Sequence, residues 1–386
     1  MQNAVIVDTL RTPLGKRNGR LKDWHPVDLA GVALRELVAR TGIDPTQIDD
    51  VIMGCVMQVG EQSLNIARNA VLAAGLPETI PGTTVDRQCG SSQQAAHFAA
   101  QGVIAGAYDV VVAAGVEVMT RVPMGSAVAD GKYGYPFGPM VSARYAPDGG
   151  LVPQGISAEM IADKWSITRE DMDRFGVQSQ SRAARATAEG RFEREILPVK
   201  DAEGNMMTTD EGLRETTMES LGGLKPAFDK DGTITAANAS QLSDGGSAVV
   251  MMSERFVKDR GIKALGQVVS YGMVAGPDNA SLLTQPSRAI LKALNKVGMK
   301  VSDINLFELN EAFATVGIAS MADLGISDDI VNVNGGAIAL GHPIGMSGNR
   351  VALTILHELR RRGGGVGAAA LCGGGGQGDA IIVRTV

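Results

Sequence analysis

The chain has three cysteines, and the position of one of them predicts a nucleophile. Cys89 lies in DRQCGSSQQAAHFAAQGVIAG, between a strand-like stretch and a run of small residues typical of a helix. Most free cysteines are simply small buried hydrophobes. A helix N-terminus, however, directs free backbone N–H groups at such a sulfur and favours the thiolate by about 0.3–1 kcal/mol. That is less than one pKa unit, about 1.4 kcal/mol, so a working nucleophile also needs a base.

The base must come from one of four histidines, and His342 is the strongest candidate. It lies in NVNGGAIALGHPIGMSG between a glycine and a proline, where neither a regular helix nor a central strand is expected. The alternative is a glycine-rich turn with an incidental histidine. We expect His25 to cap a helix, His97 to be structural and His357 to lie at the surface.

Two further positions in the second half interrupt apolar runs. Cys372 ends the strand-like AAALC and opens into GGGGQG, and open α/β sheets bind ligands at the ends of their strands. The alternative is a core thiol beside a flexible turn. Asn310 stands in FELNEAFA between a predicted strand and a predicted helix, where it would either cap the helix or hold a water molecule.

Strand and helix patterns alternate along the first part of the chain. We expect strands within 4–13, 48–58, 82–89 and 108–119, and helices within 25–42, 63–75 and 91–106. The apolar run in 108–119 is continuous, which is typical of a strand buried on both faces. Such alternation predicts a mainly parallel α/β sheet.

The pattern changes near Thr120, where irregular sequence rich in Gly, Pro and Met gives way to charged helices. We interpret the region from about 120 to 238 as an insertion into a first domain that spans 1–262. A second α/β unit, 264–386, has a similar order of elements. We therefore expect two similar halves related by an approximate internal twofold.

The composition is that of a globular protein with a sizeable core, with 386 residues, 44% hydrophobic and 20% charged. The net charge of −6 and the lack of a Lys/Arg block argue against nucleic acid as a partner. The cysteine spacing fits neither a disulfide framework nor a metal site and indicates a reducing compartment. We see no signal peptide and no apolar run that would span a membrane, so we expect a cytoplasmic protein.

Four motifs, taken in order, resemble those of the thiolase family, and the similarity covers essentially the whole chain: RQCGSSQQA, NEAF, NGGAIALGHPIGMSG and LCGGGGQG. The resemblance implies two similar five-stranded α/β domains in a layered core, with a loop domain inserted in the first. It also implies thiolytic cleavage of 3-ketoacyl-CoA, or the reverse Claisen condensation of two acyl-CoA molecules. Members of the family are usually homotetramers or homodimers.

The resemblance assigns a role to each polar residue above. Cys89 would be the nucleophile that becomes acylated, and His342 would take its proton and later donate to the thioester oxygen. Cys372 would act as acid and base at the acetyl α-carbon. Asn310 would hold a water in the same oxyanion site, and the N–H groups of Cys89 and Gly374 would form a second oxyanion hole. No metal or redox cofactor is implied, because coenzyme A enters as a substrate.

Two positions would contact coenzyme A by the same resemblance. Ser240 in NASQLSDGG would touch the pantetheine arm. Arg214 in EGLRETT would meet the adenine or phosphate end, and the alternative for it is a plain surface arginine.

One departure from the family bears on the substrate. Short-chain biosynthetic thiolases tend to carry HMG-TAEN, whereas this chain has PQGISAEM, in which Pro153 and Gln154 replace the His-Met pair. We therefore expect a degradative 3-ketoacyl-CoA thiolase with a roomier acyl pocket, acting in fatty-acid or related β-oxidation. The alternative is a biosynthetic acetoacetyl-CoA thiolase.

Two functions other than that of a thiolase would be compatible with parts of this sequence. A decarboxylating ketoacyl synthase shares the ancestral fold but lacks a second catalytic cysteine, so Cys372 argues against it. A CoA- or lipid-binding protein without catalysis would be expected to lack Cys89 or His342, and both are present.

Overall fold

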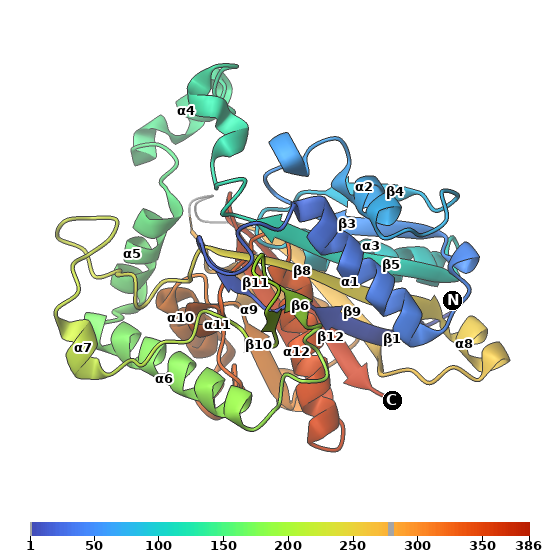
Figure 1. The fold of residues 1–386 in the computed structure, drawn as a ribbon. Coiled ribbons are helices and arrows are strands. Elements are labelled where there is room, and N and C mark those ends of the chain that lie inside the picture. Colours follow the sequence, from blue (N-terminus) through green and yellow to red (C-terminus); the bar gives the residue numbers. More distant parts are fainter. Residues whose placement is uncertain (1, 277–281) are drawn as a thin grey trace.

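The computed structural model describes residues 2–276 and 282–386 (Figure 1). Ten strands in this part of the chain form one sheet: β1 (Ala4–Arg11), β2 (Gly15–Lys16), β3 (Asp50–Gly54), β4 (Gly82–Val85), β5 (Val110–Val118), β8 (Ser243–Ser253), β9 (Gly266–Ala275), β10 (Leu306–Leu309), β11 (Val366–Gly373) and β12 (Gln377–Thr385). Their order is β10-β11-β12-β9-β1-β8-β5-β3-β4, with β2 beside β8. A separate pair is formed by β6 (Val199–Lys200) and β7 (Met206–Met207).

The sheet is mixed, so the expectation of a mainly parallel sheet is wrong. Within the described residues, β3–β4, β3–β5 and β10–β11 pair in parallel, and the other strand pairs are antiparallel. The lengths of the connections explain part of this. Only residues 374–376 separate β11 from β12, which is too short for the crossover that a parallel pair needs.

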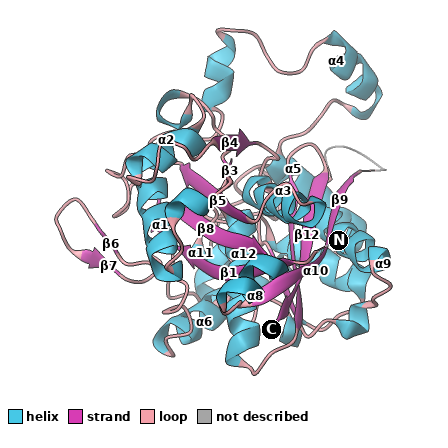
Figure 2. Cartoon of the chain, turned by 90° about the vertical axis from the view of Figure 1, so that its right-hand side faces the viewer, coloured by secondary structure: helices cyan, strands magenta, loops and turns pink. Residues whose placement is uncertain are grey.

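Six helices cover and divide the sheet: α1 (Pro26–Thr41), α2 (Ile66–Ala73), α3 (Ser91–Ala105), α9 (Gln285–Lys296), α10 (Ala314–Leu324) and α12 (Ser347–Arg361). Helices α1 and α2 pack on the strands of the first half, and α9 and α10 pack on the strands of the second half, each on the face turned away from α3 and α12. Between the halves, α3 and α12 share one apolar cluster with strands of both. Helix and strand layers therefore alternate, and the expected layered α/β core is confirmed (Figure 2).

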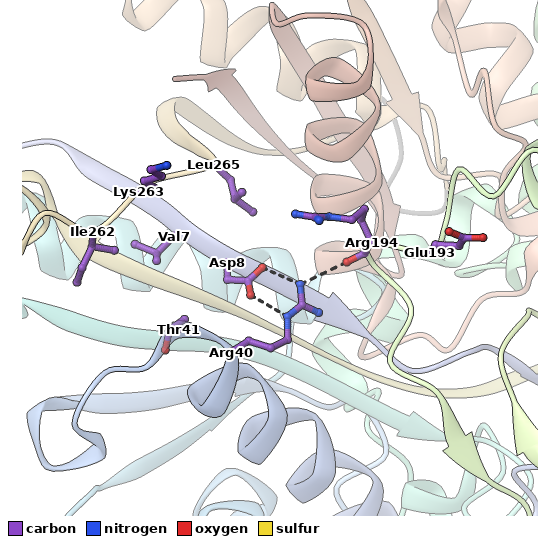
Figure 3. Close-up of a pocket in the computed structure, with 9 residues that line it drawn as sticks. All are labelled: Val7, Asp8, Arg40, Thr41, Glu193, Arg194, Ile262, Lys263 and Leu265. Atoms are coloured by element: carbon purple, nitrogen blue, oxygen red, sulfur yellow. Dashed lines mark hydrogen bonds and ion pairs between the residues drawn. The ribbon is translucent and has the colours of Figure 1, made fainter.

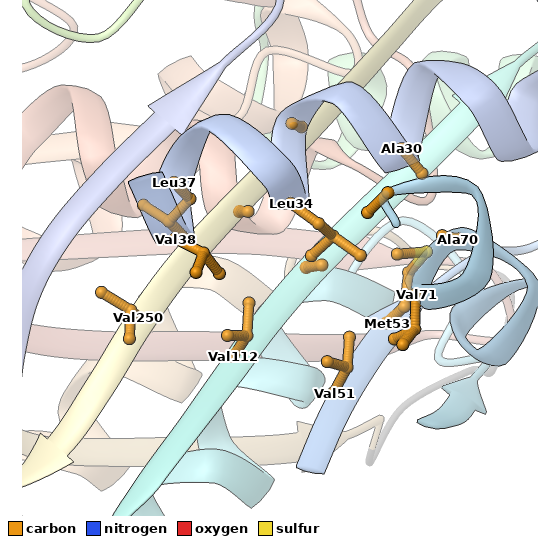
Figure 4. Packing of buried hydrophobic residues seen from close by; sticks show 14 of the residues in the cluster. Ala30, Leu34, Leu37, Val38, Val51, Met53, Ala70, Val71, Val112 and Val250 are labelled. Atoms are coloured by element: carbon orange, nitrogen blue, oxygen red, sulfur yellow. The ribbon is translucent and has the colours of Figure 1, made fainter. Parts of the chain in front are cut away.

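The strand β5 confirms the expectation of burial on both faces. Every residue of β5 is buried. Val112 packs in the cluster that contains Leu34 and Val38 of α1 (Figure 4). Its neighbours Val111 and Ala113 point the other way, into the cluster that contains α3 and α12. Successive side chains of a strand point to opposite faces of the sheet, and here both faces are apolar. Such a strand is buried between two layers of the core.

The two halves meet through a short seam. The first half contributes β4, β3, β5, β8 and β1 to the sheet, and β9 joins it through only two residue pairs, Val5–Gln267 and Ile6–Gly266. The resemblance implies five strands in each half. In the described residues, the second half has four strands and an isolated bridge between Phe307 and Val331 beside its edge strand.

Between β5 and β8 the chain leaves the sheet and forms further helices: α4 (Pro139–Tyr145), α5 (Gln154–Trp165), α6 (Arg169–Ala188) and α7 (Met218–Gly222). Helix α4 lies near the tip of an arm that projects from the body (Figure 1). Helices α5 and α6 pack on α10 of the second half. The remaining helices are α8 (Glu254–Arg260) and α11 (Ala337–Leu340). None of the helices described here is long and apolar enough to cross a membrane.

Two glycines of the sheet allow the first turn of α3 to lie directly on the strands. A methyl group on Gly54 of β3 would lie 2.2 Å from the backbone nitrogen of Ser92. A methyl group on Gly115 of β5 would lie 2.5 Å from Cβ of Ser92. Since Cys89 lies just before this turn, the close approach sets the position of its backbone.

We expect Gly54→Ala to destabilise the protein by about 1–3 kcal/mol, because the added methyl group must displace the backbone of α3. Chemical denaturation measures the change in the free energy of unfolding. Gly223→Ala is the matched control, because a methyl group there would meet no atom within 4 Å. Equal stability of the two variants would contradict the prediction.

Candidate active site

Cys89 lies in a tight turn between β4 and α3. The residue before it, Gln88, has a left-handed φ of 51°, a conformation that non-glycine residues rarely adopt. The Ser91 hydroxyl donates to the carbonyl of Gln88 at 2.6 Å and accepts the N–H of Arg87 at 2.9 Å. These bonds hold the strained turn, which presents the cysteine just ahead of the helix.

The Cys89 thiol is buried among groups that donate hydrogen bonds. Burial is the main cause that raises its pKa, to about 11, so the thiol is neutral at pH 7. Its own backbone N–H, the side-chain amide of Gln154 and the N–H of Gly374 act in the opposite direction. The helix N-terminus therefore does not produce a thiolate by itself, and proton removal by a base is needed, as the sequence predicts.

His342 is held as a neutral base with a defined tautomer. Its Nδ1 lies 2.6 Å from the Ser347 hydroxyl, which itself donates to the carbonyl of Pro343 at 2.8 Å. The hydroxyl has one hydrogen, so it must accept from Nδ1–H, and Nε2 is left as the acceptor. Burial, with a smaller effect of Arg350, lowers the pKa of His342 to about 3.

Asn310 lies beside this base. It follows β10 directly, and its Nδ2 donates to Nε2 of His342 at 3.3 Å. Of the two alternatives for Asn310, the helix cap is wrong, because α10 begins four residues later, at Ala314, and Phe313 stands at its N-cap. The Oδ1 atom is buried and has no hydrogen-bond partner among the described residues, so it can accept from a bound molecule.

Cys372 lies near the end of β11, in the other half of the sheet, and near the same group of residues. Its side chain is buried in a cluster with Phe313 and Ile338. Burial raises the pKa of this thiol, and the charge of Cys89 raises it further, which places the two sulfurs within electrostatic reach. Gly374, two residues on, directs its N–H at Cys89.

An apolar cavity of about 410 Å³ opens onto this group of residues. Its lining is Met119, Met124, Pro153, Gln154, Gly155, Phe228, Ala239, Ser240, Gln241, Leu242, Ala312, Phe313, His342 and Ile344. Cys89 packs against Met119 and Ile344 of this lining. Ser240 is therefore at the cavity, whereas Arg214 is exposed, does not line it, and donates to the carbonyl of Ala236 at 3.4 Å.

One residue that the sequence analysis missed ties the site together. Glu117 of β5 is buried and accepts the N–H groups of Val56 at 2.9 Å, Met57 at 3.1 Å and Gly345 at 3.0 Å, and the amide of Gln62 at 2.6 Å. Burial raises its pKa to about 7. The signal was a single acidic residue within the otherwise apolar run of 110–118.

Other polar residues also differ from expectation or were missed. Glu311, next to Asn310, accepts from the Ser179 hydroxyl at 2.6 Å and from the N–H of Ile338 at 3.1 Å, and so anchors the glycine-rich segment to α6. His357 is half-buried against Thr9 rather than at the surface. His25 caps α1, as expected, by accepting the N–H of Val27.

A second cavity, of about 610 Å³, lies between β1, the end of α1 and the segment before β9 (Figure 3). Asp8 and Arg40 in it are ion-paired at 2.9 Å, and Arg40 also donates to the carbonyl of Arg194. It shares no lining residue with the first cavity and is lined by no cysteine or histidine. We therefore place the active site at the first cavity. Within residues 2–276 and 282–386, no cluster of metal-ligating side chains is found.

Two family models match the chain: the thiolase N-terminal domain over residues 4–255 and the thiolase C-terminal domain over residues 262–385. The steroid 3-ketoacyl-CoA thiolase FadA6 of Mycobacterium tuberculosis is 44% identical over 100% of this chain and 94% of its own length. The 3-ketoacyl-CoA thiolase of Aliivibrio fischeri is 42% identical, with 99% of each chain covered. The crystal structure of the Bacillus anthracis acetyl-CoA acetyltransferase is 37% identical, with a TM-score of 0.90 over 100% of this chain and 99% of that one.

The ring of His342 is expected to stay neutral from pH 5 to 8, because its pKa is lowered to about 3. Ring ¹⁵N chemical shifts should show the Nδ1–H tautomer throughout that range. An unfolded chain takes up the proton below its ordinary pKa of about 6.5, so the contribution of His342 to stability decreases as the pH falls below that value.

Ser347→Ala removes the acceptor of Nδ1–H and should mix the two tautomers in the same spectrum. Ser320→Ala is the control, because its buried hydroxyl has no hydrogen-bond partner within the described part of the chain. A protonated ring at pH 6 in the unsubstituted protein would overturn the assignment.

Proposed function

Because the chain belongs to the thiolase family, we propose that it is a degradative thiolase that cleaves a 3-ketoacyl-CoA into acetyl-CoA and a shortened acyl-CoA. As a thiolase it is an acyltransferase. The observation that supports this proposal is that the neutral base His342 lines an apolar cavity, while Cys89 and Cys372 each pack against other residues of its lining. The steroid 3-ketoacyl-CoA thiolase and the 3-ketoacyl-CoA thiolase among its relatives support the degradative direction in lipid metabolism.

Acylation begins when Nε2 of His342 takes the proton of the Cys89 thiol. The sulfur attacks the ketone carbon, and the electron pair of the carbonyl moves to its oxygen. The N–H groups of Cys89 and Gly374 stabilise this oxyanion, and each such donor is typically worth about 2.7–4 kcal/mol. In support of this role, both N–H groups act to lower the pKa of the Cys89 thiol.

Carbon–carbon cleavage then releases acetyl-CoA as an enolate and leaves the acyl group on Cys89. The enolate oxygen receives hydrogen bonds from protonated His342 and from a water held by Asn310, whose buried Oδ1 is otherwise unpaired in the described structure. The enolate carbon takes the proton of Cys372. The thiol of coenzyme A then gives its proton to Cys372 and attacks the thioester, and Cys89 leaves with the proton of His342. The scheme needs no metal or redox cofactor.

Coenzyme A would enter along the inserted region. Ser240 is half-buried at the cavity and would contact the pantetheine arm. Arg214 is exposed and bonded to Ala236, four residues from Ser240, and would meet the adenine or phosphate end.

The protein would work as a homodimer or homotetramer in the cytoplasm. Large apolar side chains on the projecting arm, including Tyr133 and Met140, are exposed in the single chain and would be covered in an assembly. The three buried, unpaired cysteines fit a reducing compartment.

Substitution of Cys89 and substitution of Cys372 should block different half-reactions. Cys89→Ala should abolish formation of the acyl-enzyme, measured as a mass increase after incubation with acyl-CoA. Cys372→Ala should still acylate but should not exchange the α-protons of acetyl-CoA with deuterium. Cys55→Ala is the control, a buried cysteine outside both roles. Deuterium exchange that persists in Cys372→Ala would refute the acid/base role.

Thiolysis rates over a series of 3-ketoacyl-CoA chain lengths should rise above that of acetoacetyl-CoA, because the cavity of about 410 Å³ leaves room beyond a methyl group. Each methylene that leaves water contributes about 0.8 kcal/mol, or roughly a fourfold gain in kcat/KM. A preference for acetoacetyl-CoA would instead support the biosynthetic alternative, which the acetyl-CoA acetyltransferase of Syntrophomonas wolfei, 42% identical, keeps open.

A further inference from the structure

The cavity holds one side-chain amide that contacts the reacting sulfur. Gln154 is the first residue of α5 and lines the cavity, and its amide acts to lower the pKa of the Cys89 thiol, against the effect of burial. The other amide in the lining, that of Gln241, is occupied by the carbonyls of Gly212, Ile338 and Ala339. The amide of Gln154 is therefore the side-chain donor of this cavity that serves the sulfur.

The same amide lies beside the place where the oxyanion would form. A methyl group on Gly374 would lie 3.4 Å from Nε2 of Gln154. The N–H of Gly374 and the amide of Gln154 therefore approach the sulfur of Cys89 from neighbouring positions. A ketone oxygen bound to the backbone donors would lie within reach of the amide as well.

The backbone around Gln154 is fixed by the first turn of α5, which sets the point from which its side chain extends. Pro153 precedes it with a φ of −60°, and the carbonyl of Pro153 accepts the N–H of Ser157 in the first turn of α5. The buried face of α5, with Ala158 and Ile161, packs in the cluster that contains Cys372. A preorganised donor needs no rearrangement when charge develops.

We propose that Gln154 is a catalytic residue, which stabilises the Cys89 thiolate and then the ketone oxyanion by donating its amide N–H. This inference rests on the proposed function. As the sulfur lone pair forms the S–C bond, the carbonyl π electrons move to the oxygen. The Gln154 amide then donates to that oxygen instead of to the sulfur.

The charges around Cys89 make a neutral donor valuable. Glu117 opposes thiolate formation, as does the burial of the sulfur itself. Cys372 lies within electrostatic reach and His342 is neutral until it takes the proton. A hydrogen bond to a charged group is worth about 1.5–3 kcal/mol, or roughly a 10- to 100-fold change in the equilibrium.

Alkylation of Cys89 by iodoacetamide tests the first role without any substrate. Gln154→Met keeps the volume of the side chain but removes the donor. Because the pKa of the Cys89 thiol is about 11, its alkylation rate follows the small thiolate fraction at lower pH, and the rate of the variant should fall about tenfold or more throughout the profile from pH 7 to 10. Site-specific mass spectrometry separates Cys89 from Cys55 and Cys372. Gln47→Met, the same substitution at a residue outside the lining of the cavity, is the control and should leave the profile unchanged.

Single-turnover acylation by a 3-ketoacyl-CoA tests the second role. Gln154→Met should slow it by more than it slows alkylation, and Gln154→His, which restores an N–H at a similar distance, should recover part of both rates. If Gln154→Met fails to fold, Gln154→Leu tests the same loss of the donor.

An unchanged pH profile and an unchanged acylation rate in the apolar variants would overturn the role of Gln154. Failure of the proposed function is distinguishable from this result. In that case the unsubstituted protein would cleave no 3-ketoacyl-CoA, while the alkylation profile would still depend on Gln154.

Discussion

The active site depends on one buried carboxylate. Glu117 accepts four hydrogen bonds and thereby joins the segment after β3 to the segment that follows His342. Hydrogen bonds to a charged group are among the strongest in a protein, and leaving such donors unpaired in the interior is costly. The approach is so close that a methyl group on Gly345 would lie 2.5 Å from the carboxylate. The segment after β3, whose Val56 packs against Cys89, is therefore tied to the segment that follows His342, although the two come from different halves of the chain.

A second property of the site is that its reactive groups are uncharged at rest. Burial raises the pKa of both catalytic thiols and lowers that of His342. A proton that moves from Cys89 to His342 therefore creates an ion pair in surroundings of low polarity, where fixed N–H dipoles act strongly. The hydrogen-bond donors of the site are backbone and amide groups, which keep their orientation while charge appears and disappears.

The residues that we propose to react were recognisable in the sequence, and so were most of the elements that carry them. Cys89, His342 and Cys372 interrupt regular patterns with glycine-rich turns, and such interruptions are visible without a structure. The residues that hold them are less visible. Glu117 is concealed in an apolar strand, and Ser347 is an ordinary residue at a helix start. Their importance depends on which distant backbone groups they meet in the fold.

The errors in the sequence analysis have the same origin. The alternation of strands and helices predicts the order of elements along the chain. Whether two strands pair in parallel or antiparallel depends instead on where strands such as β8 and β12 enter the sheet. Asn310 is of a residue type that often caps helices, but α10 begins only four residues after it, at Ala314. Gln154 could be recognised as a departure from short-chain biosynthetic thiolases, but its effect on the Cys89 thiol depends on where the fold places α5.

The seam between the halves has an evolutionary consequence. Cys89 belongs to the first half, whereas His342 and Cys372 belong to the second, and the sheet joins them through two residue pairs. A chimera that exchanged one half between relatives would inherit its nucleophile from one parent and its base from the other. Exchange of a half would therefore give an active protein only where the two parents match along this seam and around the active site.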